Sequence, residues 1–133
     1  MNNDQVIPYH KESVQKAKEI ASRVSSPLAA YLAITKYVSK YFVYDYVKAV
    51  KIAKQPHVLP DIETTWKLHM GVCQDLAAMT VGMLRGVGID ASMCVGKAGG
   101  RIRHAWVEAS IGGKRYRYDY KGKAATYITE KRW

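Results

Sequence analysis

The feature that most constrains the fold is a change in hydrophobic periodicity near Gly86 and Gly88. Before these glycines, apolar residues recur every three or four positions, as on one face of an α-helix. After them, residues 89–97, 102–110 and 114–120 alternate in polarity as β-strands do. A chain with its helices first and adjacent strands last favours an α+β fold, in which N-terminal helices pack on an antiparallel β-meander.

The helical part of the chain is predicted to contain four helices. The first spans residues 11–24. The second starts at Ser25–Ser26–Pro27, where a serine cap precedes a proline of the first turn, and runs out near Phe42. We expect its core-facing side chains to be Leu28, Tyr31, Leu32, Thr35 and Val38.

The other two helices flank Gly71. Asp61 can cap a short helix that reaches Leu68, and a longer helix begins near Cys73 and ends at Gly86. The segment 44–60 is ambiguous, and its two prolines, Pro56 and Pro60, predict a loop at its end.

The Gly112–Gly113 pair is a strong signal for a hairpin turn between the last two predicted strands. A two-residue turn pairs Ile111 with Lys114, and a four-residue turn leaves the same register. A three-residue turn with a bulge would shift it.

This register has a consequence for two polar side chains. It places Asp119 opposite Trp106, and Trp106 lies on the same strand face as His104 because side chains alternate. Asp119 is then the diagonal neighbour of His104, at roughly 7–8 Å between Cα atoms. We therefore expect a hydrogen bond between this carboxylate and the imidazole.

Cys73 is the best candidate for a nucleophile. It lies in the first turn of a predicted helix, where backbone N–H groups and the helix dipole favour a thiolate. With His104 as a base and Asp119 orienting it, the chain holds the three roles of a cysteine-dependent acyl-transfer site. Spacing alone does not place Cys73 beside His104.

Four motifs in order carry a resemblance to a known family: GVCQDLAA at 71–78, RGVGIDASMCVG at 85–96, HAWVE at 104–108 and YRYDY at 116–120. Together they resemble the transglutaminase-like (papain-related) cysteine protease superfamily over about residues 28–121. One departure is Tyr120, where the family often has proline.

The resemblance implies a single catalytic domain over residues 1–133, with Cys73 as nucleophile, His104 as base and Asp119 as orienting group. The family's activities are peptide hydrolysis, amide hydrolysis and transamidation, each through a thioester. The oxyanion would be stabilised by the Cys73 backbone N–H and by a side chain for which the candidates are Tyr44, Tyr46 and Trp66. Trp106 is expected in the core or in the wall of the site.

The remaining cysteine and histidines have simpler interpretations. Cys94 lies mid-strand and is predicted to be a core residue. His69 is a rival base, since it precedes Cys73 by four residues, whereas His10 and His57 are expected on the surface. No pair has the spacing of a zinc site, and no acidic loop suits calcium, so neither a metal nor another cofactor is expected.

The net charge of +10 favours anionic partners. It is concentrated in residues 97–133, which hold ten basic and three acidic residues, including Lys114, Arg115, Arg117, Lys121 and Lys123. We expect a peptide or protein amide substrate with acidic character. The alternative is a non-enzymatic module that binds an anionic polymer or nucleic acid, although we expect no nucleic acid as partner.

The sequence says less about location. No apolar run reaches membrane-spanning length, and the first residues lack the apolar core of a signal peptide. We expect an extracellular protein whose signal has been removed, in preference to a cytoplasmic one, and a domain of a larger secreted protein remains an open alternative.

Overall fold

The computed structural model describes residues 2–53, 55 and 58–133. The four predicted helices are present as α2 (Lys11–Ala21), α3 (Pro27–Tyr41), α5 (Ile62–Leu68) and α6 (Cys73–Gly86). Their caps follow the sequence signals, because Ser26 accepts from the Ala29 N–H and Asp61 from the Thr64 N–H. The part of the predicted loop at Pro56 and His57 lies outside the described residues.

The C-terminal strands form one antiparallel sheet in the order β5-β4-β3-β6. The strands are β3 (Asp90–Ala98), β4 (Arg101–Ile111), β5 (Lys114–Tyr118) and β6 (Tyr127–Arg132). Ile111 pairs with Lys114 and Val107 with Tyr118, so the predicted hairpin register is confirmed. The fold is α+β, with the helices packed on an antiparallel sheet, as expected.

Several short elements were not predicted. They are α1 (Asn3–Val6), α4 (Tyr46–Ile52), β6 and the two-residue strands β1 (Val43–Tyr44) and β2 (Met70–Gly71). Strands β1 and β2 pair in parallel, with Tyr44 opposite Gly71. The two-residue strands are too short for a periodic pattern, and packing rather than local preference determines them.

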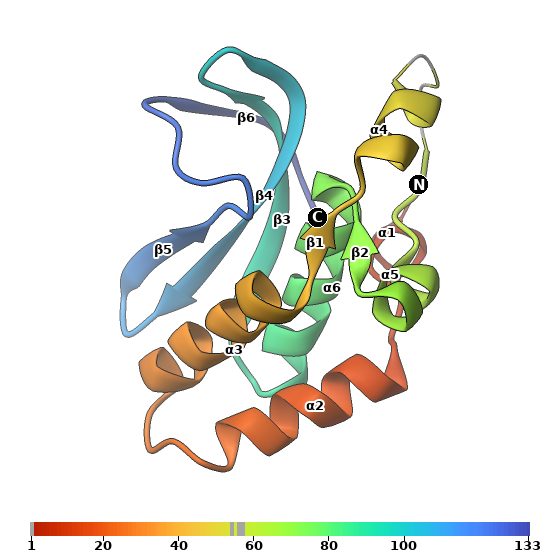
Figure 1. Cartoon of the computed structure of the whole chain (residues 1–133). Coiled ribbons are helices and arrows are strands. Elements are labelled where there is room, and N and C mark those ends of the chain that lie inside the picture. Colours follow the sequence, from red (N-terminus) through yellow and green to blue (C-terminus); the bar gives the residue numbers. More distant parts are fainter. Residues whose placement is uncertain (1, 54, 56–57) are drawn as a thin grey trace.

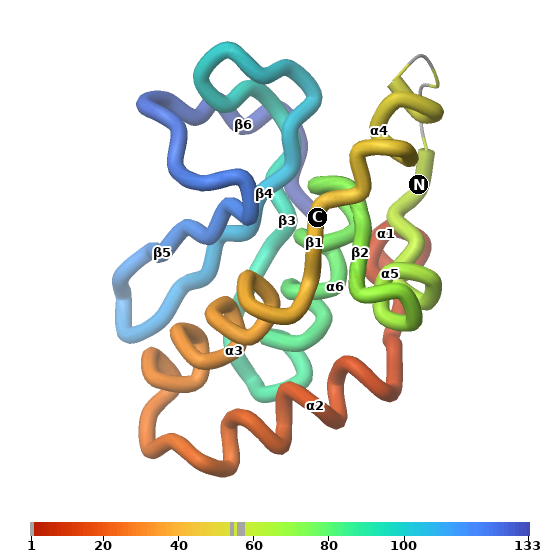
Figure 2. The backbone as a smooth tube through the Cα atoms, in the orientation of Figure 1, coloured from red at the N-terminus to blue at the C-terminus, as the bar shows by residue number. Residues whose placement is uncertain are grey.

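Helix α6 lies at the centre of the molecule, between the sheet and the N-terminal helices (Figure 1). It packs against α2, α3 and α5 on one side and against β3 and β4 on the other. The smooth trace shows the last strand, β6, at the edge of the sheet opposite β5, with the C-terminal end near this helix (Figure 2). There the Arg85 guanidinium donates to the Trp133 carbonyl oxygen.

Two sequence predictions about burial are wrong. Leu32 was expected in the core but is 55% exposed, and Ile34 is buried on the same helix instead. The inward face of α3 is therefore rotated from the predicted one. His10 was expected on the surface, yet it is buried and caps α2, accepting from the Ser13 N–H. Cys94 is fully buried, as predicted.

Strand β4 contains a bulge just before His104. Gly96 pairs with His104 and Ala98 with Arg101, so Lys97 faces both Ile102 and Arg103. Arg103 takes a left-handed backbone conformation with φ 53°, which costs a non-glycine residue about 1–2 kcal/mol. A bulge of this kind redirects the side chains beside it.

Among the described residues, none of the helices combines the length and apolar character needed to cross a bilayer.

Candidate active site

His104 and Asp119 form the centre of the candidate site. His104 Nε2 lies 2.9 Å from Asp119 Oδ1 and 2.8 Å from Oδ2, and both side chains are buried. The expected carboxylate–imidazole hydrogen bond is present. It depends on the hairpin register, which brings the residue after β5 to the face of β4 that carries His104.

Asp119 receives further hydrogen bonds that the sequence did not predict. Tyr127 of β6 donates its hydroxyl to Oδ2, at 3.0 Å, and the Lys121 backbone N–H donates to Oδ1, also at 3.0 Å. Arg101 lies at 3.6 Å from the same carboxylate. These donors fix the orientation of the carboxylate that holds His104, and they stabilise its ionised form.

The two groups alter each other's ionisation. Burial opposes the charged imidazolium, but hydrogen bonds to Asp119 and Cys73 outweigh it and raise the pKa of His104 to about 9. Burial also opposes the ionised carboxylate, yet the hydrogen bond and charge of His104 hold the pKa of Asp119 below its usual value. At neutral pH the pair is therefore an imidazolium beside a carboxylate.

Cys73 is the first residue of α6 and is partly exposed. It is close enough to His104 for its hydrogen bond to contribute to the raised imidazole pKa. Its position depends on Gly71, where a Cβ atom would lie 2.8 Å from both the Asp75 Cβ and the Thr65 Oγ1. Only glycine fits this close approach of chain segments just before the helix.

Tyr44 contacts the start of α6 from β1. The parallel pairing with Gly71 places it there, and the Asp45 N–H donates to the Gly71 carbonyl at 2.9 Å. Burial and the charge of Cys73 raise the pKa of Tyr44, although a hydrogen bond with the Cys73 backbone acts in the opposite direction. The phenol is thus protonated at neutral pH and lies next to both the side chain and the backbone of Cys73.

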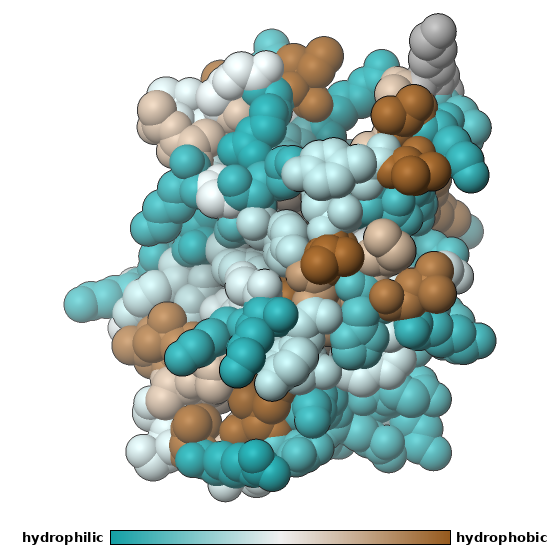
Figure 3. All heavy atoms as spheres, viewed as in Figure 1, coloured by the Kyte–Doolittle hydropathy of each residue, from teal (hydrophilic) through white to brown (hydrophobic). Residues whose placement is uncertain are grey.

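A pocket of about 570 Å³ opens beside Cys73. One wall comes from α4 and the segment after it, and the other from β3, β4 and β6. Helix α4 buries none of its side chains, and hydrophobic side chains gather over it in the space-filling view (Figure 3). The helix contributes Ala49 and Ile52 to the pocket, so this wall is apolar.

Asp75 holds this wall in place. It is fully buried and accepts from the Lys48 ammonium of α4 at 2.7 Å, from the Asp61 N–H at 2.8 Å and from the Val72 N–H at 3.0 Å. One carboxylate, two residues after Cys73, thus joins α4, the start of α5 and the start of α6. Such a hydrogen-bonded buried ion pair fixes the geometry of the groups around it.

The other predicted site residues are Trp106, Tyr46 and Trp66, and they differ in what they contact. Trp106 stacks on His104, with ring centroids 6.1 Å apart, and Tyr46 contacts Tyr44 at 4.9 Å. Trp66 packs on Phe42, in an aromatic cluster, and is not among the described residues that line the pocket.

The rival base His69 is also held by its own contacts. Its ring stacks on Phe42 at 4.5 Å, and its Nδ1 lies 3.0 Å from the Tyr41 carbonyl oxygen.

The basic residues of the last strands are largely engaged within the sheet. Glu108 lies within 3.4 Å of Arg115, Arg117 and Arg132, and it also accepts from the Trp106 indole N–H. These interactions occur on the face of the sheet opposite α6, where Trp106 packs in a small separate core. Three of the ten basic residues in 97–133, a part of the chain that the structure describes throughout, therefore share one carboxylate, and the other basic residues there do not contact it.

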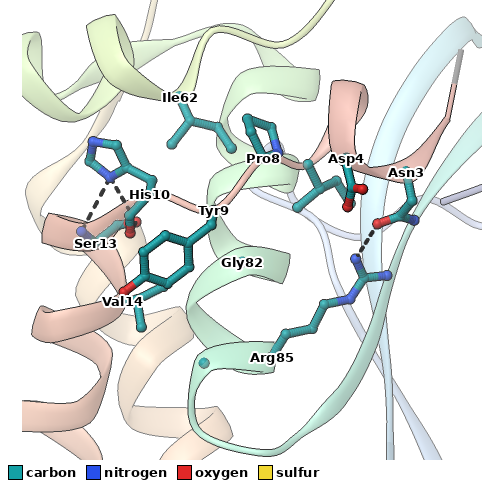
Figure 4. Close-up of a pocket in the computed structure, with 12 residues that line it drawn as sticks. Asn3, Asp4, Pro8, Tyr9, His10, Ser13, Val14, Ile62, Gly82 and Arg85 are labelled. Atoms are coloured by element: carbon teal, nitrogen blue, oxygen red, sulfur yellow. Dashed lines mark hydrogen bonds between the residues drawn. The ribbon is translucent and has the colours of Figure 1, made fainter.

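A second pocket, of about 320 Å³, lies among α1, α2, α5 and α6 (Figure 4). In it Arg85 points toward Asn3, and His10 is bonded to Ser13. His10 Nε2 also lies near two carboxylates, Glu63 at 2.9 Å and Glu12 at 3.2 Å. Among the described residues this trio is the group that could hold a metal ion. However, Nδ1 accepts from the Ser13 N–H, so the proton of the neutral imidazole lies on Nε2. The nitrogen that faces the two carboxylates then carries a proton instead of the free lone pair that a metal ion needs.

Comparison with known proteins identifies the family. The model of the transglutaminase-like superfamily matches residues 14–121, and the chain belongs to this superfamily. A search of curated proteins gave no match.

Solved structures share the fold. One is a provisionally assigned protease from Parabacteroides distasonis, with a TM-score of 0.71 and 16% identity over 88% of this chain. Another is a provisionally assigned cysteine protease from Cytophaga hutchinsonii, with a TM-score of 0.67 and 20% identity over 90% of this chain. A third, described as a TGase, has a TM-score of 0.63 and 20% identity over 97%. This chain spans 25%, 40% and 34% of their respective lengths.

Proposed function

We propose that the protein is a cysteine-dependent acyl-transfer enzyme acting on peptide amides. The observation that carries the proposal is His104, whose imidazole is hydrogen-bonded to the buried Asp119 carboxylate and whose raised pKa owes part of its shift to Cys73. Membership of the transglutaminase-like superfamily supports it. A nucleophile, a base and an orienting carboxylate in this order suit attack on a carbonyl carbon.

The reaction proceeds in two steps. The Cys73 sulfur attacks the amide carbonyl carbon, and His104 delivers a proton to the nitrogen as the C–N bond breaks, which leaves a thioester. Water or a second amine then attacks the thioester carbonyl and gives its proton to His104 while the C–S bond breaks. The product is an acid or a new amide, the Cys73 sulfur is released, and the proton is back on His104.

The oxyanion would lie between two donors at the start of α6. The Cys73 backbone N–H is one, and the Tyr44 hydroxyl, which lies next to it, is the other. We expect Tyr44→Phe to lower the acylation rate by about 10²-fold, as loss of one oxyanion donor does. Tyr46→Phe is the matched control, and equal rates for the two variants would exclude this role for Tyr44.

The test of the proposed function is acylation by p-nitrophenyl acetate. We expect a burst of p-nitrophenol stoichiometric with enzyme, and an acetyl group on Cys73 in peptide mass spectra. Cys94→Ala should retain the burst, because that thiol is fully buried and burial raises its pKa to about 11. Absence of a burst, or acetylation of Cys94 in preference to Cys73, would contradict the proposal.

The alternative of an anionic-polymer binding module has weaker support. The arginines of β5 and β6 are paired with Glu108, and the Arg117 guanidinium also stacks on Tyr127 at 4.0 Å. Strong nucleic-acid binding by a protein that gives no burst would favour this alternative.

A further inference from the structure

We propose that Arg103 and Lys131 make the Cys73 pocket selective for substrates that carry a carboxylate close to the reacting amide. The inference rests on the proposed function, because it names the substrate class for the same site. It concerns two residues that the sequence motifs do not include, one from the bulge of β4 and one from β6.

The lining of the pocket combines apolar walls with cations. The described lining residues of segments 49–53 and 58–60 and of the two central strands are mainly apolar, among them Ile52, Leu59 and Val95. Within the described part of the lining, every charged side chain is positive, namely Arg103 and Lys131. Cations in a pocket with low-dielectric walls attract anions more strongly than the same cations on an open surface.

Arg103 differs from the other arginines of the sheet. Arg101 pairs with Asp119, and the three arginines at 115, 117 and 132 pair with Glu108. Arg103 is exposed and has no ion pair within residues 2–53, 55 and 58–133. Its backbone is held in the left-handed region, at φ 53°, by the bulge that places it at the pocket. The fold thus directs an unneutralised charge toward the space beside Cys73.

Lys131 supplies the second charge from the neighbouring edge of the pocket. Its ammonium lies 4.6 Å from the centre of the Trp133 ring, which holds the side chain near the pocket without neutralising it. The carboxylates of Asp75 and Asp119 do not compensate, because both are buried and bonded to their own donors. The pocket therefore keeps a net positive potential.

The experiment compares alkylation of Cys73 by iodoacetate and by iodoacetamide, which differ chiefly in charge. For Cys73 and for a small free thiol at the same pH, the rate with iodoacetate is divided by the rate with iodoacetamide. We expect this ratio to be roughly tenfold higher for Cys73 than for the free thiol, at the low end of the range for electrostatic focusing. It should fall as salt is added.

Four charge-neutralising variants, one of them a control, assign the effect. Arg103→Gln and Lys131→Gln should each lower the ratio about threefold, and the double variant should lower it about tenfold, in line with two comparable charges. Glutamine keeps a non-glycine side chain at the left-handed position, so the strain is similar. Lys114→Gln, at the exposed start of β5, changes the net charge equally and should leave the ratio unchanged.

The outcomes separate the two proposals. If Cys73 reacts with neither reagent faster than Cys94, the proposed function fails. If it reacts with both but the ratio matches the free thiol, or if Lys114→Gln lowers it as much as Arg103→Gln, the selectivity proposal is overturned. Chloromethyl ketones ending in Leu-Glu and Leu-Gln then show on which side of the reacting amide the substrate carboxylate lies. Faster reaction of the glutamyl reagent places the carboxylate on the acyl side. Equal rates for the two reagents, together with a raised iodoacetate ratio, place it on the leaving-group side.

Discussion

Two regions of this molecule contain a histidine bonded to a carboxylate, with a hydroxyl or thiol nearby. In the second pocket, His10 lies between Ser13 and Glu63. At the candidate active site His104 is bonded to Asp119, and Cys73 contributes to its raised pKa. The residue types suit nucleophilic catalysis in both places. Their surroundings differ, and that difference separates a structural role from a catalytic one.

The first difference concerns the side chain in the place of a nucleophile. Ser13 is buried, its N–H donates to His10 Nδ1, and its hydroxyl lies 3.2 Å from the His10 carbonyl oxygen. Its contacts are those of a helix cap. Cys73 is partly exposed and lines a pocket of about 570 Å³.

The second difference concerns the carboxylate. The Glu63 side chain is 58% exposed, whereas that of Asp119 is 1% exposed and accepts from a tyrosine and a backbone N–H besides the imidazole. Water and salt screen the His10–Glu63 pair, whereas burial strengthens the His104–Asp119 pair. A carboxylate orients a histidine firmly only where it is itself held, so similar residue sets do not imply similar functions.

The largest expected effect concerns the nucleophiles. Cys73→Ala should reduce acylation by p-nitrophenyl acetate by at least about 10⁴-fold, because the covalent route is lost. Ser13→Ala should leave the rate unchanged and lower the free energy of unfolding by about 1 kcal/mol through loss of its hydrogen bonds. Burst kinetics and urea unfolding measure the two effects. A rate loss in Ser13→Ala would break the distinction between the two regions.

The histidines should show the next largest contrast. We expect His104→Gln to lower the acylation rate by about 10²–10⁴-fold, the usual contribution of a general base. His10→Gln should keep the rate and lose about 1 kcal/mol of stability, because His10 caps α2. His69→Gln is a further control, and retention of activity by His104→Gln but not by His69→Gln would reassign the base.

The third prediction concerns pH. Since the pKa of His104 is raised from 6.5 to about 9, its contribution to stability is complete below about pH 6.5 and is lost as pH rises through about 9. An NMR titration should show the His104 ring losing its proton near pH 9, and Asp119→Asn should move this to lower pH. A ring that titrates near its usual value in the unaltered protein would contradict the proposed coupling.

The smallest effects compare the two carboxylates. Asp119→Asn should lower the free energy of unfolding by about 2 kcal/mol, because it disturbs a buried, charge-assisted set of hydrogen bonds. For Glu63→Gln we expect a thermal midpoint within replicate scatter, because the side chain is exposed and its pairs are screened. A clear loss of stability in Glu63→Gln would show that the His10–Glu63 pair is as strongly coupled as the His104–Asp119 pair.

The sequence determined the features that depend on neighbours along the chain. Periodicity and caps defined α2, α3, α5 and α6, and the Gly112–Gly113 turn set the register that joins His104 to Asp119. The prediction of the register succeeds because the turn and the alternation of side chains together fix which faces of the two strands coincide.

Only the tertiary structure decided which distant segments meet. Tyr127 reaches Asp119 from a strand without a clear pattern, Tyr44 reaches Cys73 through a two-residue parallel pairing, and a bulge places Arg103 at the pocket. The same holds for Glu63, which lies 53 residues from His10 in sequence. Such contacts arise when α6 and the sheet pack around a shared core, and that packing follows from the summed shape and burial of many side chains rather than from any local pattern.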